Sequence, residues 1–126
     1  MLYSVDADKC LTTIPHLADF QRWRARLSDA EFKAIVDELN AKVDGGTIHT
    51  SSWMPGNNWA GTVFDPIYQK ACDQDETASA RCFGLFLWVV MVNRPETWAF
   101  GRYKLKDIPI EGLTYFIVDK RCQESA

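Results

Sequence analysis

The sequence is poor in metal-binding patterns: it has only two histidines, and none of its four cysteines lies within three residues of another. Structural zinc sites need such ligands at short, regular spacing. The glycine motifs GxGxxG and GxxxxGK[ST], which hold phosphate groups, are also absent. We therefore expect neither a metal nor a cofactor.

No charge of one sign dominates the chain. The net charge is −3, and residues 1–63 carry 6 basic and 8 acidic groups against 8 and 9 in residues 64–126. Nucleic-acid-binding proteins carry a basic patch or stripe, so we expect no nucleic-acid partner. The longest apolar run, residues 82–92, has eleven residues. A membrane-spanning helix needs about 17, so we expect no membrane partner.

The four cysteines are Cys10, Cys72, Cys82 and Cys122, and no basic and apolar leader precedes them. Disulfides are rare in the cytosol. We therefore expect reduced thiols and a cytoplasmic protein. Cys82 lies at the edge of the apolar run and is expected to be a small core residue.

Aromatic side chains are the feature that the sequence has in excess: they make up 13% of 126 residues and include five tryptophans. The apolar share of 47% and the charged share of 25% are ordinary for a globular domain. The length predicts one domain over residues 1–126, with the polar last residues frayed.

Apolar spacing predicts a helix from Pro15 to Leu27. A second helix begins at Ser28, where Ser28 and Glu31 form a capping box, and ends at residues 45–46, with one glycine in the left-handed conformation. Further along the chain, Asp65 as a cap followed by Pro66 predicts a short helix, and residues 77–92 predict a buried one, although a strand is the alternative at residues 82–92.

Alternating patterns predict strands at residues 1–5, 47–52, 98–103 and 113–118, the last two forming a hairpin with a long loop. This order of elements is typical of α+β proteins. We expect a three- or four-stranded antiparallel sheet with helices packed on one face. Because the run at 82–92 has no polar face, we also expect a homodimer that covers one side of it.

Ligand-binding residues are predicted in two places. The loop at 51–61 combines indoles and amides around a Pro-Gly turn. In the strand at 98–103, Arg102 shares a face with Trp98 and Phe100, where an arginine stacks on an aromatic ring, pairs with a carboxylate or lines a pocket. Asn and Trp together suit a flat polar ligand such as a sugar or a nucleobase. The alternative is that each Trp fills the core beside the turn. The candidates are Trp53, Asn57, Asn58, Trp59, Arg102 and Tyr103.

His49 and Ser51 are the catalytic candidates, because residues two apart share a face of a strand and these two could act as base and nucleophile. No GxSxG elbow surrounds Ser51, and no third member of a triad can be assigned. The alternative is a partly buried histidine whose hydrogen bonds are satisfied by the fold.

Three functions follow, in order of preference. The first is a small non-enzymatic binding domain for a polar or aromatic ligand. The second is a regulatory or accessory protein that acts through a protein partner, and the third is a small hydrolase or isomerase that uses His49. No motif identifies a family; in general character the chain resembles small accessory proteins carried on bacterial mobile gene cassettes.

Overall fold

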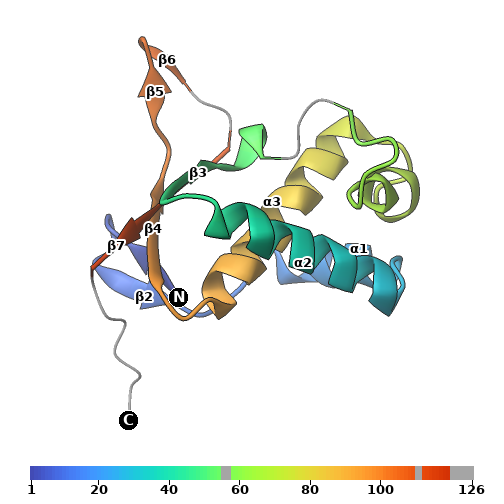
Figure 1. Cartoon of the computed structure of the whole chain (residues 1–126), viewed down its shortest axis with the longest axis horizontal. Helices are drawn as coiled ribbons and strands as arrows, with labels where there is room; N and C mark the ends of the chain where they lie inside the picture. The colour runs from blue at the N-terminus through green and yellow to red at the C-terminus, as the bar shows by residue number, and fades with distance from the viewer. Residues whose placement is uncertain (55–57, 110–111, 120–126) are drawn as a thin grey trace.

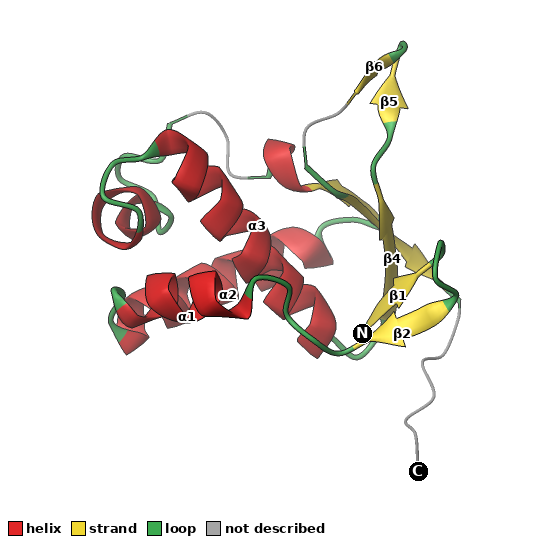
Figure 2. Cartoon of the chain, turned by 180° about the vertical axis from the view of Figure 1, so that it is seen from behind, coloured by secondary structure: helices red, strands yellow, loops and turns green. Residues whose placement is uncertain are grey.

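The computed structural model describes residues 1–54, 58–109 and 112–119, with no side-chain description for 53, 105 and 109. In these ranges three α-helices lie on one side of a five-stranded sheet (Figures 1 and 2). The α+β class is therefore confirmed. The helices are α1 (Leu17–Ala25), α2 (Asp29–Asp44) and α3 (Glu76–Asn93).

Helix α2 begins as its capping box predicts. The Ser28 hydroxyl accepts a hydrogen bond from the Glu31 amide at 3.0 Å, and the Glu31 carboxylate accepts one from the Ser28 amide at 2.9 Å. The expected left-handed glycine is wrong: Gly45 has φ −75°, and Gly46 does not have a positive φ. Instead the last carbonyls accept from the amides of Gly45 and Gly46 and from the His49 ring.

Helix α3 confirms the helical interpretation of the apolar run, and it packs against both α1 and α2. Phe86 contacts Phe20 and Phe32 from α1 and α2 at ring-centroid distances of 5.7 and 5.2 Å, while Trp88 contacts Phe100 of the sheet at 4.9 Å. The chain's own elements thus bury the helix. The observation that suggested a homodimer is explained within one chain, and the dimer itself stays a prediction.

The sheet differs from the expected three or four antiparallel strands. Its order is β2-β1-β4-β7-β3, and it is mixed because β1 pairs with β4 in parallel. The sequence pattern does not predict strand β2, because three residues of mixed polarity are too short to show alternation. The strands are β1 (Leu2–Ser4), β2 (Lys9–Leu11), β3 (Ile48–Thr50), β4 (Thr97–Gly101) and β7 (Thr114–Val118).

The predicted hairpin is present as the antiparallel pair of β4 and β7. Its long loop holds a second, two-stranded ribbon of β5 (Lys104–Leu105) and β6 (Ile108–Pro109) that projects from the sheet (Figure 2). The strand expected at 47–52 ends at Thr50 and continues as a 3-10 turn, η1 (Ser51–Trp53). The short helix predicted after Asp65 is a π-helical turn, η2 (Ile67–Ala71).

The cysteines correct one expectation. Cys10 lies in β2 and is disulfide-bonded, so the prediction of four reduced thiols is wrong. Cys72 and Cys82 are free and buried, which confirms Cys82 as a core residue. Cys122 lies outside the described residues. Sequence spacing could not reveal the bond, because bridged cysteines meet only in the folded chain, and the cytoplasmic expectation loses the support of reduced thiols.

Candidate functional site

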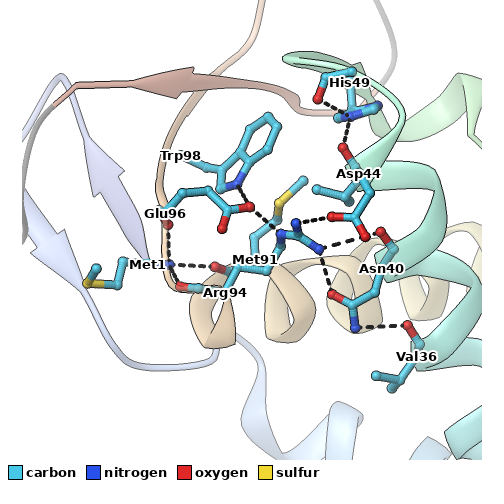
Figure 3. Close-up of polar contacts among 11 residues, drawn as sticks. Met1, Val36, Asn40, Asp44, His49, Met91, Arg94, Glu96 and Trp98 are labelled. Carbon is cyan, nitrogen blue, oxygen red and sulfur yellow. Dashed lines mark hydrogen bonds and ion pairs between the residues drawn. The ribbon is translucent and has the colours of Figure 1, made fainter.

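A first cavity, of about 470 Å³, lies between α2 and the C-terminal end of α3. Its polar groups are bound to one another (Figure 3). Arg94 donates from Nη1 to the Asn40 side-chain oxygen at 2.8 Å, from Nη2 to Asp44 and from Nε to Glu96. The Trp98 indole also donates to Glu96, at 3.1 Å. These contacts join α2 to the start of β4.

The electrostatics of this cluster are those of an internal ion pair. Burial by itself raises the pKa of Glu96. Hydrogen bonds from Arg94 and Trp98, together with the positive charge of Arg94, outweigh this effect, so the pKa of Glu96 lies below its ordinary value of 4.5. The Met1 ammonium donates to the Met91 and Glu96 carbonyls at 2.9 Å each (Figure 3). Because the cluster satisfies its own charges, we assign it to stability.

A second cavity, of about 440 Å³, lies at the opposite end of α3. This volume falls within the roughly 300–1,000 Å³ usual for small-molecule pockets. Three segments form its walls: the loop before η2, η2 itself and the first turns of α3. The lining residues are Asn58, Trp59, Ala60, Asp65, Tyr68, Gln69, Glu76, Ser79 and Ala80.

The aromatic wall of the second cavity is held firmly. The Trp59 ring packs against Phe64 at 6.1 Å and against Phe83 at 6.0 Å, and those two rings contact each other at 5.3 Å. Trp59 is nevertheless only partly buried, and it is one of the residues that line the cavity. Asn58 accepts a hydrogen bond from the Ala60 amide at 3.0 Å, which orders the neighbouring turn.

The charged wall is acidic. Asp65 and Glu76 are the only charged lining residues, and within the described ranges neither forms an ion pair. Neither carboxylate caps a helix: η2 has no side-chain cap, which corrects the expected role of Asp65, and Asp75 caps α3 by accepting from Ala78 at 3.0 Å. Both carboxylates therefore remain available to a ligand.

A buried layer of small polar groups lies beneath this cavity. Ser79 is 3% exposed and donates to the Asp75 carbonyl at 2.7 Å. Ser79 lies near Cys72, and Cys72 lies near Cys82, and both cysteines are buried. Burial raises the pKa of both thiols, and because the thiolate is the nucleophile, these cysteines are unreactive core residues.

The predicted ligand-binding residues fall into separate places. Asn58 and Trp59 line the second cavity together. Arg102 and Tyr103 are exposed between β4 and β5 and do not line it, and the Tyr103 ring contacts Phe116 at 6.2 Å. Asn57 and the side chain of Trp53 lie outside the described residues.

The catalytic candidates contact the backbone. His49 Nε2 lies 2.9 Å from the Val43 carbonyl and 3.2 Å from that of Gly46, at the end of α2. The Ser51 hydroxyl accepts from the Leu113 amide at 3.1 Å. Chain direction changes between the two residues, since β3 ends at Thr50 and Ser51 begins η1. The His49 side chain thus connects β3 to the end of α2, and the Ser51 side chain connects η1 to the segment before β7.

The remaining lining residues are not assigned to a binding site by the sequence pattern. In the sequence, Asp65 and Glu76 are typical of residues at the start of a helix, and Tyr68 is typical of a residue within a short helix. The available signal is the presence of four acidic residues, Asp65, Asp73, Asp75 and Glu76, within residues 65–76. The turn between η2 and α3 brings two of them, Asp65 and Glu76, to one cavity.

In the part of the chain that the structure describes, neither a metal-binding cluster nor a membrane-spanning helix points to a function, and no similar protein does so. Within the described residues, no group of three or more His, Cys, Asp or Glu side chains is placed to hold a metal ion. In the same part of the chain, every helix is too short or too polar to cross a lipid bilayer. No family model, curated protein or solved structure matches this chain.

Proposed function

We propose that this chain is a small binding domain, and that its ligand is a small polar molecule with an apolar or aromatic part. The ligand would occupy the cavity lined by Asn58 and Trp59. The observation that carries the proposal is the composition of this cavity, which joins an indole and a phenol to amide and carboxylate groups. Such a combination of flat apolar surface with a few convergent polar groups is typical of small-molecule sites.

The contrast between the two cavities supports this choice. In the first cavity, Arg94 already binds Asn40 and Asp44, so a ligand would have to displace internal hydrogen bonds. In the second, Asp65, Glu76 and the Tyr68 hydroxyl have no side-chain partner among the described residues. A ligand that binds these three groups displaces no internal side-chain hydrogen bond among the described residues, although Asn58 and Gln69 each accept one already.

Thermal shift measurements against sugars, nucleosides, amino acids and amines test the proposal. A ligand at 100 times its Kd adds about 2.7 kcal/mol of stability, which raises the Tm of a domain of this size by several degrees. Tyr68→Phe and Asn58→Ala should weaken binding of any compound that raises Tm. Tyr103→Phe is the matched control, because Tyr103 is 45% exposed and lies outside the cavity.

Two results would contradict the proposal. One is a panel in which no compound raises Tm, and the other is a ligand whose affinity is unchanged in both cavity variants, Tyr68→Phe and Asn58→Ala. A panel without effect would favour the second candidate, a protein that acts through a protein partner. One observation favours that candidate: Ile48 is 67% exposed on β3, an edge strand of the sheet. Exposed edges and apolar side chains suit contact with another chain.

A further inference from the structure

The charges of the second cavity restrict its ligand. Its two charged lining residues, Asp65 and Glu76, are both negative, and no lysine or arginine lines it. Of the cations close to it in the chain, Lys70 of η2 pairs with Glu31 at 2.7 Å, Arg26 donates to the Ala71 carbonyl at 2.7 Å, and the exposed Arg81 of α3 does not line the cavity. An anionic ligand would therefore meet repulsion and no compensating charge.

A neutral ligand would also be disfavoured. It would displace water from the half-buried Asp65 and leave that carboxylate without a counter-charge, whereas the exposed Glu76 keeps more of its hydration. Desolvating an unpaired charge is costly. A cation supplies the missing charge. Two aromatic residues, Trp59 and Tyr68, also line the cavity, and the faces of aromatic rings attract ammonium groups through the ring quadrupole.

A metal ion fits less well than an organic cation. Among the described residues no three candidate ligands converge, whereas hard divalent cations need six or more oxygen ligands, supplied in part by water. The aromatic wall would contribute nothing to a hydrated metal ion. It would contribute contact area to a ligand with a carbon body.

We infer that the cavity between the Asn58–Ala60 loop, η2 and α3 binds a small organic ammonium ion. Asp65 and Glu76 would neutralise its charge, and Trp59 and Tyr68 would contact its apolar body. This inference rests on the proposed function, because it names the ligand class of the same cavity.

Isothermal titration calorimetry with three probes of one shape tests the inference. Tyramine, tyrosol and 3-(4-hydroxyphenyl)propionate share a phenol ring and a short side chain, but they are cationic, neutral and anionic. We expect tyramine to bind about 10-fold or more tighter than the other two, which corresponds to roughly 1.4 kcal/mol. Raising the salt concentration should weaken tyramine binding, because the carboxylates are partly solvated.

Charge-removing variants locate the effect. Asp65→Asn and Glu76→Gln should each weaken tyramine binding about 5-fold, as expected for a partly exposed charge pair. Neither change should weaken tyrosol binding, because a neutral ligand gains nothing from either negative charge. Asp73→Asn is the matched control: it removes the same charge from the same end of the molecule, outside the cavity. Asn tolerates the φ of 51° at this position, so binding should change less than about 2-fold.

Equal binding of tyrosol or of the anion, or no binding of tyramine, would overturn the ammonium assignment. If tyramine fails while another compound raises Tm in a Tyr68-dependent manner, the binding function stands and only the ligand class is wrong. If no compound raises Tm, both proposals fail together. An equal loss of tyramine affinity in Asp73→Asn would show a general effect of net charge and would also overturn the site.

Discussion

Replacing Arg94 with methionine should destabilise the fold more than any exposed ion-pair change. The Arg94 side chain is only 14% exposed, and it contacts Glu96, Asp44 and Asn40 at once. Methionine keeps the length of the apolar stem, so the change removes the guanidinium with little loss of packing. It leaves the partly buried Glu96 carboxylate with the Trp98 indole as its remaining side-chain donor.

The magnitude follows from the burial of each partner. A hydrogen bond to a charged group contributes about 2 kcal/mol and a neutral one about 1 kcal/mol, which applies to Glu96 and Asn40. Asp44 is 65% exposed, so its pair with Arg94 contributes less than about 1 kcal/mol. We therefore expect Arg94→Met to lower the free energy of unfolding by about 3 kcal/mol.

Urea denaturation followed by circular dichroism measures this loss. With a slope of about 1.5 kcal/mol per molar urea, the midpoint should fall by about 2 M. The control is Arg22→Met, because Arg22 and its partner Asp19 are 53% and 42% exposed, and its midpoint should move by less than about 0.3 M. A shift for Arg94→Met as small as that of the control would refute the reasoning.

Two further predictions concern backbone strain and pH. Gly112→Ala should lower the free energy of unfolding, measured by urea denaturation, by about 2 kcal/mol, because Gly112 has φ +78° and the added Cβ would clash with the Ser51 hydroxyl. Gly61→Ala, at φ +76° in open space, should lower it by less. Equal losses in the two variants would contradict the predicted clash. The pKa of Glu31, lowered by hydrogen bonds from Lys70 and Ser28, and that of Glu96 both lie below 4.5 in the folded chain. The stability that these two carboxylates contribute is therefore present above pH 4.5 and is lost as pH falls through their pKa values in the folded chain. The decrease of Tm with acid should be smaller in Glu31→Gln than in the unaltered chain. Identical curves of Tm against pH would contradict this assignment.

The parts of the fold that local chemistry determines were predictable. The Ser28–Glu31 capping box fixes the start of α2, and the apolar run of α3 is too long and continuous for a typical strand. The parallel pairing of Tyr3 with Ala99 was not predictable, because it joins residues 96 positions apart. Nothing in either short segment specifies its partner, and the same holds for the disulfide of Cys10.

The candidate site was predictable only on its loop side. Asn58 and Trp59 were recognisable because amides and indoles around a Pro-Gly turn suit a polar ligand, although Asn58 also orders the turn and Trp59 also packs on the core. Asp65 and Glu76 had a competing explanation as helix caps, and in the structure neither residue acts as a cap. A carboxylate before a helix gives the same sequence signal whether it caps the helix or faces a cavity, so only the three-dimensional arrangement separates the two roles.

The position of β7 has a consequence for how the chain is made. Because β7 lies between β4 and β3, and β4 is the parallel neighbour of β1, a growing chain on the ribosome cannot close this sheet until residues 114–118 have emerged. Until then α2 can form alone, whereas β3 has no neighbour and the apolar face of α3 has no complete sheet to cover it. A nascent chain at that stage exposes apolar surface and is prone to aggregation unless a chaperone covers it. Strand β7 follows every other described helix and strand in the chain, so its emergence controls when the nascent domain can close over its apolar helix.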